Sequence, residues 1–383
     1  MQTTTGIASP QVASNPDLDY LLAQVAEAVQ LTNDQYNRAT GHYEAVGDWL
    51  AAPGGPLAAF APTIYPQGSM RLGTTVKPRG EVEYDLDFVC EVRGGAWTAM
   101  KLYDAVHDRL HAHETYRAKL KKKKRCLSLE YAGDFHMDII PAIADLSRGG
   151  TCVKIPDTAL ASWTPSNPRG YADWFKQRST VLVERLMKAA ATEPLPIQSD
   201  ASEKLPLALA VQLMKRARDV AFNGADDAPR SIILTTLSGN YYSGGTCVVS
   251  AIIEVARAIQ RLVRTAAPGP ISVVNPSNPD EDFTDGITGE RQRALGSFAS
   301  MLEARVVELT QLRGERLRLA LEKLFDGGPG AKVHPVAAAF QKYAELQKTR
   351  RDAGTLTSSA KGLGVVAPLA GGFRVPSNTY FGD

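Results

Sequence analysis

The sequence predicts an α+β fold, in which a mixed sheet with helices is followed by a mainly helical region. Two observations predict this class. Residues 82–92 and 127–140 have the apolar and β-branched content of strands. From about Tyr171 onward the apolar residues recur at helical spacing, first over 205–220 and then over 295–321. We therefore expect a sheet in the middle of the chain and a second, helical lobe after it.

The remaining segments complete this outline. Apolar residues over 17–50 recur at three- and four-residue steps, which predicts one long helix or two in succession. Residues 273–285 are rich in Pro, Asn and Asp and favour an ordered loop, and the Gly-, Ala- and Ser-rich residues 353–372 predict a mobile tail. The predicted units are a leader and helix over 1–50, a sheet core over 51–175, a helical lobe over 176–350 and a flexible tail over 351–383.

Composition excludes several classes of protein. The formal net charge is +2, so any site for a polyanion must come from a local cluster of cations rather than from a global field. No apolar run approaches the roughly 20 residues that span a bilayer, and the first residues lack a basic segment followed by an apolar one. A cytoplasmic location is expected. The four cysteines contain no CxxC pair and are interpreted as reduced structural thiols.

The first chemical signal is Gln67-Gly68-Ser69, which follows Pro66. A Gly-Ser turn that leads into a helix can offer backbone N–H groups and a hydroxyl to phosphate oxygens, because no Cβ obstructs close approach. The alternative is a plain turn with a serine helix cap.

The second signal is Asp85-Leu86-Asp87 in a predicted strand. Strand alternation places Asp85 and Asp87 on one face. Two adjacent carboxylates at the end of a largely apolar strand are unfavourable unless a cation lies between them, so the pattern indicates bound Mg²⁺. The alternative is a solvated edge strand.

The third signal is a strand around 135–140, in which His136 and Asp138 share a face and Pro141 is expected to end the strand. A carboxylate on a neighbouring strand could complete a two-metal site and help to deprotonate an attacking hydroxyl. Asp138 is preferred for this role, because Asp134 next to Gly133 is better explained as a turn residue. His136 could line the site or be structural.

The order of these motifs is more specific than any one of them. In this order the sequence resembles the polymerase-β-like nucleotidyltransferases and, among them, the bacterial CD-NTases. These are relatives of cyclic GMP-AMP synthase and oligoadenylate synthase that make nucleotide second messengers in anti-phage (CBASS) systems. The resemblance covers most of residues 17–290 and rests on the stretches 67–74 (QGSMRLGT), 84–87 (YDLD), 135–142 (FHMDIIPA), 166–175 (SNPRGYADWF) and 213–219 (LMKRARD).

The resemblance implies a two-lobed enzyme joined by a long N-terminal helix, with a nucleoside triphosphate between the lobes. Asp85 and Asp87 would hold two Mg²⁺ or Mn²⁺ ions, and Asp138 would complete the coordination of the catalytic ion. Gln67, Gly68 and Ser69 would bind the nucleotide.

In relatives a lysine and a later serine of the second lobe contact the triphosphate, and Lys215 and Ser231 fit that spacing. A cation there would offset charge on the leaving pyrophosphate. Arg216 or Arg218 could serve in place of Lys215, and a solvated helix face is the alternative for Lys215.

The activity implied by the resemblance joins two or three ribonucleotides into a cyclic product and releases pyrophosphate at each step. ATP and GTP are the expected substrates, and pyrimidine nucleotides stay open. One rival is an enzyme that adds a nucleotide to an RNA, protein or small-molecule acceptor. Another is a non-catalytic sensor of nucleotides or RNA, which is disfavoured because all three acidic residues are present.

Two segments bear on partners. The basic run 119–125 (KLKKKKR) could bind nucleic acid, but it precedes a strand and contains no aromatic residue, so a solvated hairpin tip is preferred and nucleic-acid activation is not expected. Residues 376–383 carry two aromatics after the predicted tail. In some CBASS systems a partner conjugates the synthase through its C-terminus, and this end is compatible with that or with a tail docked on its own domain. We expect a monomer.

Overall fold

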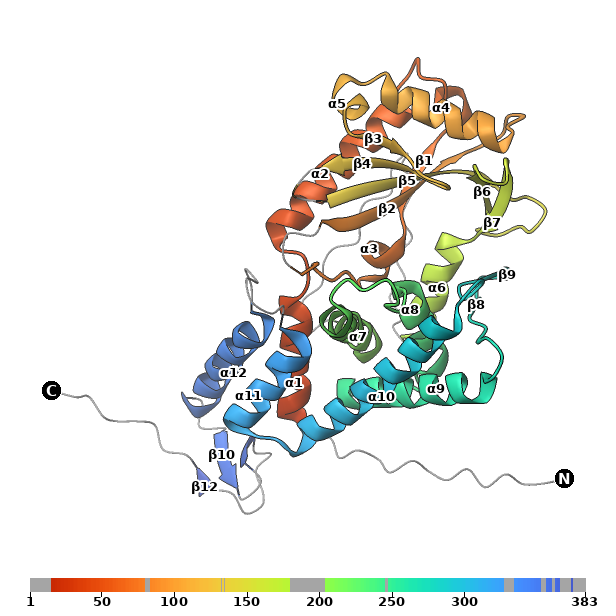
Figure 1. The fold of residues 1–383 in the computed structure, drawn as a ribbon. Helices are drawn as coiled ribbons and strands as arrows, with labels where there is room; N and C mark the ends of the chain where they lie inside the picture. The colour runs from red at the N-terminus through yellow and green to blue at the C-terminus, as the bar shows by residue number, and fades with distance from the viewer. Residues whose placement is uncertain are drawn as a thin grey trace.

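A computed structural model describes residues 15–79, 83–131, 133, 135–179, 204–244, 247–326 and 334–352, together with the backbone of three short strands beyond Asp352. Figure 1 shows the sheet and its helices above a second body made of helices, with α3 (Gly68–Leu72) and α6 (Pro168–Arg178) on the side of the sheet that faces the helical body. The predicted α+β class and its two parts are confirmed.

The sheet is mixed, as predicted. Its central strands β2 (Tyr84–Val92) and β5 (Phe135–Ala144) pair in parallel, and every other pairing in this sheet is antiparallel. One face is covered by α2 (Asn33–Ala51) and by α4 (Ala99–His111), which pack with the strands in one apolar cluster. The strand order is β1 (Thr63–Pro66), β2 (Tyr84–Val92), β5 (Phe135–Ala144), β4 (Leu127–Tyr131) and β3 (Leu120–Lys122), and β6 (Val153–Asp157) and β7 (Ser162–Ser166) continue from β5.

Two details of the sheet differ from the prediction. The segment expected as strand over 127–140 is a hairpin of β4 and β5 around Gly133, whose φ is +78°. Pro141 does not end β5, which continues to Ala144. The reason is a gap in pairing: along β5 the pairing with β4 stops at Ile139 and the pairing with β6 starts at Ile143, so on that side the missing N–H of Pro141 has no ladder to interrupt. Asp134 lies outside the described residues.

The N-terminal segment forms two helices in succession, one of the two predicted alternatives, and not the single long helix that the resemblance implied. The first is α1 (Pro16–Ala28) and the second is α2 (Asn33–Ala51), which begins with a capping box between Thr32 and Gln35. Their apolar faces go to different bodies, since Leu22 of α1 packs in the helical cluster and Tyr43 of α2 packs under the sheet. The pair therefore connects the two bodies, and the predicted domain boundaries stay predictions.

The helical body surrounds α7 (Pro206–Phe222), which is central in Figure 1 and buried along much of its length. Its helices and α1 share one apolar cluster. The other members are α6 (Pro168–Arg178), α8 (Ser231–Tyr241), α9 (Val248–Ala266), α10 (Gly289–Gln311), α11 (Gly314–Phe325) and α12 (Pro335–Asp352).

Two segments predicted to lack regular structure contain strands. Residues expected as a loop over 273–285 include a hairpin of β8 (Val274–Asn275) and β9 (Asn278–Asp282). Its Pro residues are tolerated because the hairpin has no further strand to pair with in the described sheet. Beyond α12, short strands β10 (Leu356–Ser359), β11 (Gly362–Val365) and β12 (Phe373–Arg374) pair with one another. The remainder of the predicted tail, including residues 375–383, lies outside the described residues.

Neither membrane spans nor disulfides are found in the part of the chain that is described. None of its helices is both long and apolar enough to cross a bilayer. All four cysteines are free thiols, as expected, and Cys90 is buried in the sheet core.

Candidate active site

A cavity of about 670 Å³ lies between the sheet and the helical body. Its sheet side is formed by α3 (Gly68–Leu72) and the start of β2, and its other side by α6, α7 and α8 with the β8–β9 hairpin. Among the residues predicted for the site, those that line the cavity are Gln67, Gly68, Ser69, Asp85, Asp87, Lys215 and Ser231.

The three predicted carboxylates lie on the parallel strands β2 and β5. Asp85 and Asp87 share a face of β2 while Leu86 and Phe88 are buried on the other, as strand alternation predicted. Asp138 of β5 is the direct neighbour of Asp87 in the pairing register. The sheet thus places the third carboxylate beside the second, although 51 positions separate them in the sequence.

This arrangement disfavours charge on the carboxylates. Desolvation, followed by repulsion from Asp138 and then from Asp85, raises the pKa of Asp87 to about 7. Desolvation and then repulsion from Asp138 also raise the pKa of Asp85. The two side chains therefore need a proton or a cation close by to be stable.

Asp138 is held by a different set of partners. Lys123 Nζ lies 2.9 and 3.1 Å from its two carboxylate oxygens, Ser128 Oγ donates to it at 2.6 Å, and Cys126 Sγ lies at 3.4 Å. Ser128 is the residue opposite Asp138 on β4. Asp138 does not line the cavity, and within the described ranges no three Asp, Glu, His or Cys side chains form a ready ligand set. Lys123 supplies the positive charge next to this carboxylate.

Gly68 is fixed by backbone geometry and by close contact. Its φ is +60°, a region that side chains with a Cβ rarely adopt, and a Cβ there would lie 2.5 Å from Asp87 Oδ2. The backbone N–H of Gln67 donates to the carbonyl of Asp87 at 2.9 Å. The Gly-Ser turn and the carboxylate strand therefore form one unit, with Ser69 at the second position of α3.

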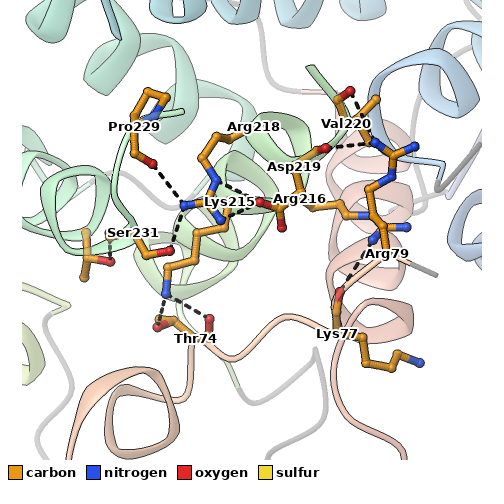
Figure 2. A network of polar contacts seen from close by, with 11 residues as sticks. Thr74, Lys77, Arg79, Lys215, Arg216, Arg218, Asp219, Val220, Pro229 and Ser231 are labelled. Carbon is orange, nitrogen blue, oxygen red and sulfur yellow. Dashed lines mark hydrogen bonds and ion pairs between the residues drawn. The ribbon is translucent and has the colours of Figure 1, made fainter. Parts of the chain in front are cut away.

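Lys215 is buried, so the alternative of a solvated helix face is wrong. Only 5% of the residue is exposed, and its ammonium donates to the carbonyl and hydroxyl oxygens of Thr74 at 3.2 and 3.1 Å. Burial, followed by repulsion from Arg218, lowers the pKa of Lys215 to about 7. The side chain faces the segment that follows α3, as Figure 2 shows.

The two arginines beside Lys215 have different positions (Figure 2). Arg218 lines the cavity and donates to Ser231 Oγ at 2.8 Å, so it orients the predicted serine. Arg216 donates to the carbonyl of Phe325 at 2.8 Å and does not line the cavity. Of the two alternatives to Lys215, only Arg218 is placed to meet a ligand.

The segment 73–79 is held to α7, and to Lys204 just before that helix, by several polar contacts that were not predicted. Besides Lys215, Gln212 Nε2 donates to the carbonyl of Thr75 at 2.9 Å, and Lys204 Nζ donates to the carbonyl of Gly73 at 2.7 Å. Arg79 donates to the carbonyl of Asp219 at 2.8 Å near the end of α7. These contacts connect the Gly-Ser turn to the helical body, and no local pattern could reveal them because their partners are more than 130 residues apart.

The basic run is paired with acidic or aromatic groups. Lys119 lies over the ring of Tyr131, and Lys123 pairs with Asp138. The other ion pairs are Lys121–Glu130, Lys122–Asp104, Lys124–Asp157 and Arg125–Asp157. The run forms β3 and the turn before β4, which agrees with a hairpin tip.

His136 lies 3.0 Å from Glu83 and does not line the cavity.

Sequence reasoning missed the part of the cavity formed by α6 and the β8–β9 hairpin. Asn167, Tyr171, Asn275, Glu281 and Phe283 line it. The stretch 166–175 contributed to the family resemblance, but nothing in it assigned these side chains a role.

Comparisons with known proteins agree with this geometry. A family model described as "Second Messenger Oligonucleotide or Dinucleotide Synthetase domain" matches residues 18–179. A c-di-GMP synthase of Roseivirga ehrenbergii is 30% identical over 96% of this chain and 97% of its own length. The cyclic dinucleotide synthase CdnG of Bradyrhizobium diazoefficiens is 31% identical over 70% of each chain. The solved structure of that CdnG in complex with GTP superposes with a TM-score of 0.69 and 27% identity, covering 85% of this chain and 99% of the other.

The fold and these relatives define a nucleotidyltransferase that makes cyclic nucleotides. The chain belongs to the bacterial CD-NTases, the family that its motifs resemble. It is therefore an enzyme that joins nucleoside triphosphates into a cyclic oligonucleotide.

Proposed function

We propose that this CD-NTase makes cyclic di-GMP from two molecules of GTP, releasing one pyrophosphate with each of the two bonds formed. The observation that carries the mechanism is the contact between Gly68 and Asp87, which joins a phosphate-binding turn to a carboxylate pair at one wall of the cavity. The choice of GTP is supported by the relative named as a c-di-GMP synthase and by the GTP complex of CdnG. The family implies a role in anti-phage defence.

The donor set at the carboxylates fits a hard divalent cation, which enzymes of this family use. All three candidate ligands are carboxylates. Desolvation and then repulsion from neighbouring carboxylates raise the pKa values of Asp85 and Asp87, and a bound cation would offset both effects. Asp85 and Asp87 would hold two Mg²⁺ or Mn²⁺ ions. Asp138 would complete the set by giving up its contact with Lys123 and binding an ion in its place. When bound, the ions would lower the pKa of the attacking ribose hydroxyl and offset charge on the phosphates.

The side chains of the chain itself bind, orient and move protons. The hydroxyl of Ser69 and the N–H groups of its turn bind the phosphates, with Gln67 at the turn's start. Lys215 and Arg218 place positive charge where pyrophosphate leaves, and Ser231, oriented by Arg218, donates a hydroxyl to the same phosphates. Asp138 accepts the proton of the attacking hydroxyl.

Nucleic acid is not required in this proposal. Each described cation of the run 119–125 already has a carboxylate or ring partner within the protein. A conjugating partner at the C-terminus stays a proposal, because that end lies outside the described residues.

The experiment offers the purified protein each labelled ribonucleoside triphosphate alone and in pairs, with Mg²⁺ or Mn²⁺, and treats the products with phosphatase. We expect a phosphatase-resistant product from GTP alone, identical to cyclic di-GMP by mass and nuclease digestion. The double variant Asp85→Ala/Asp87→Ala should give none. A product that needs ATP or a pyrimidine nucleotide would contradict the choice of GTP. A label on an RNA, protein or small molecule would contradict cyclisation.

A further inference from the structure

One wall of the cavity carries a carboxylate outside the predicted catalytic set. Glu281 of β9 lines the same cavity as Ser69 and Asp87, yet it belongs to the helical body. A negative charge repels triphosphate, so Glu281 is not explained by binding to the phosphates of a nucleotide. The base of a nucleotide carries hydrogen-bond donors, and a carboxylate can accept from these.

The Glu281 carboxylate is held in position by a chain of hydrogen bonds. The backbone N–H and the hydroxyl of Ser277 both donate to Asn275 Oδ1 at 2.9 Å, which leaves the amide nitrogen of Asn275 to donate to Glu281 Oε2 at 2.8 Å. Asn275 is only 4% exposed. Among the described residues, nothing donates a hydrogen bond to Oε1. Glu281 therefore has one oxygen without a donor and a second with a spare lone pair.

The hairpin that carries Glu281 is itself anchored to the start of α6 and to β7. Asn167 Nδ2 donates to the carbonyl of Ser277 at 2.9 Å, and Ser277 Oγ donates to the carbonyl of Asn167 at 3.1 Å. Asn278 Nδ2 donates to the carbonyl of Pro165 at 3.1 Å. A supported side chain of this kind can discriminate between ligands, because its donors and acceptors do not rearrange freely.

Two aromatic rings lie beside this carboxylate. Tyr171 and Phe283 line the cavity with centroids 6.0 Å apart in an edge-on arrangement. The Tyr171 hydroxyl lies 2.8 Å from Thr236 Oγ1, which fixes the ring. Burial raises the pKa of the Tyr171 phenol, and the nearby carboxylate of Glu281 adds to that effect. The rings offer flat apolar surface for a base.

Guanine matches this combination by its chemistry. Its N1–H and 2-amino N–H are adjacent donors, so a carboxylate can accept both at once, in the bidentate way that carboxylates accept from arginine. Adenine has an unprotonated N1, an acceptor, in the first position and no amino group in the second. A carboxylate facing adenine would therefore lose both hydrogen bonds and face a lone pair.

We propose that Glu281 determines base specificity in this cavity by accepting hydrogen bonds from N1–H and the 2-amino group of guanine. Asn275 is a positioning residue that acts through Glu281. The proposal rests on GTP being a substrate, and it names the group that selects it. A site built to hydrogen-bond a ligand rejects an analogue that lacks the partner more strongly than an apolar pocket rejects a change of size.

The test measures binding with ligands that cannot react. The probes are the 2′,3′-dideoxy triphosphates of guanosine, inosine and adenosine, since inosine keeps N1–H and lacks the 2-amino group. Dissociation constants are measured by calorimetry with Mg²⁺ for the wild type, for Glu281→Gln, and for Asp285→Asn as the control. Asp285 is an exposed acid of the same segment that does not line the cavity.

We expect the wild type and Asp285→Asn to bind the guanosine probe roughly 10-fold or more tightly than the inosine probe, and the adenosine probe more weakly still. In Glu281→Gln the guanosine-to-inosine ratio should fall toward 1. An unchanged ratio in a folded Glu281→Gln protein would overturn the proposal. Equal wild-type affinities for the guanosine and adenosine probes would overturn it even if the variant did not fold.

These outcomes are separate from those of the proposed function. A wild type that binds with the expected ratios but makes no cyclic product would support Glu281 and contradict cyclic di-GMP synthesis. A wild type that makes cyclic di-GMP, with affinity ratios unchanged by Glu281→Gln, would support cyclic di-GMP synthesis and contradict the role of Glu281.

Discussion

Replacing Gly68 by alanine tests the contact between the phosphate-binding turn and the carboxylate strand. The φ of +60° costs a residue with a Cβ about 1–2 kcal/mol. The added Cβ would also lie 2.5 Å from Asp87 Oδ2, so the carboxylate must move by about 1 Å to reach ordinary contact distance. A displacement of that size at reacting groups costs about 100-fold in rate.

The control is Gly73→Ala, at the end of the same short helix. Gly73 has a φ of +66°, but a Cβ there would meet nothing within 4 Å. Both variants should lose about 1–2 kcal/mol of unfolding free energy in chemical denaturation. Only Gly68→Ala should lose about 100-fold in the rate of pyrophosphate release from GTP, while Gly73→Ala should stay within several-fold of wild type. Equal losses of activity in the two variants would refute the role of the Gly68–Asp87 contact.

Two further predictions concern charge at the site. The pKa of Asp87 is raised from 3.8 to about 7, so between these pH values the folded state keeps a proton that the unfolded chain releases. Without divalent metal, the unfolding free energy of the wild type therefore falls as pH rises through that window. Asp87→Asn should thus be more stable than wild type by roughly 1–3 kcal/mol at pH 8 and by less at pH 5 in chelator, and parallel stability profiles would contradict this. Lys123→Met removes a partly exposed cation from Asp138, so the Mg²⁺ concentration for half-maximal activity should fall about 2- to 5-fold, whereas an unchanged or higher midpoint would argue against competition between Lys123 and the metal.

The sequence predicted what depends on local periodicity. Asp85 and Asp87 share a face because alternation along a strand is a property of neighbouring residues. The sequence analysis also singled out Gly68, because the absence of a Cβ allows phosphate to approach closely, but it did not predict the positive φ. The actual reason includes Asp87, which lies across the turn and could be known only from the structure.

Long-range pairing set the limits of prediction. Pro141 was expected to end β5, but whether a proline interrupts a strand depends on which side of it is paired. The burial of Lys215 depends on Thr74, 141 positions away, and the position of Glu281 depends on contacts between the β8–β9 hairpin and Asn167. The resemblance to CD-NTases supplied Lys215 and Ser231 from family spacing, and it gave no role to the hairpin.

The most direct test of cyclic di-GMP synthesis is the ratio of pyrophosphate released to cyclic product formed from GTP alone. Both are quantified in the same reaction with Mg²⁺, by a coupled phosphate assay and by chromatography after phosphatase treatment, for wild type and for Asp87→Asn. Two pyrophosphates per phosphatase-resistant dinucleotide in the wild type, with neither product in the variant, is the predicted result. Pyrophosphate release without a resistant product, or a resistant product that persists in Asp87→Asn, would contradict the account.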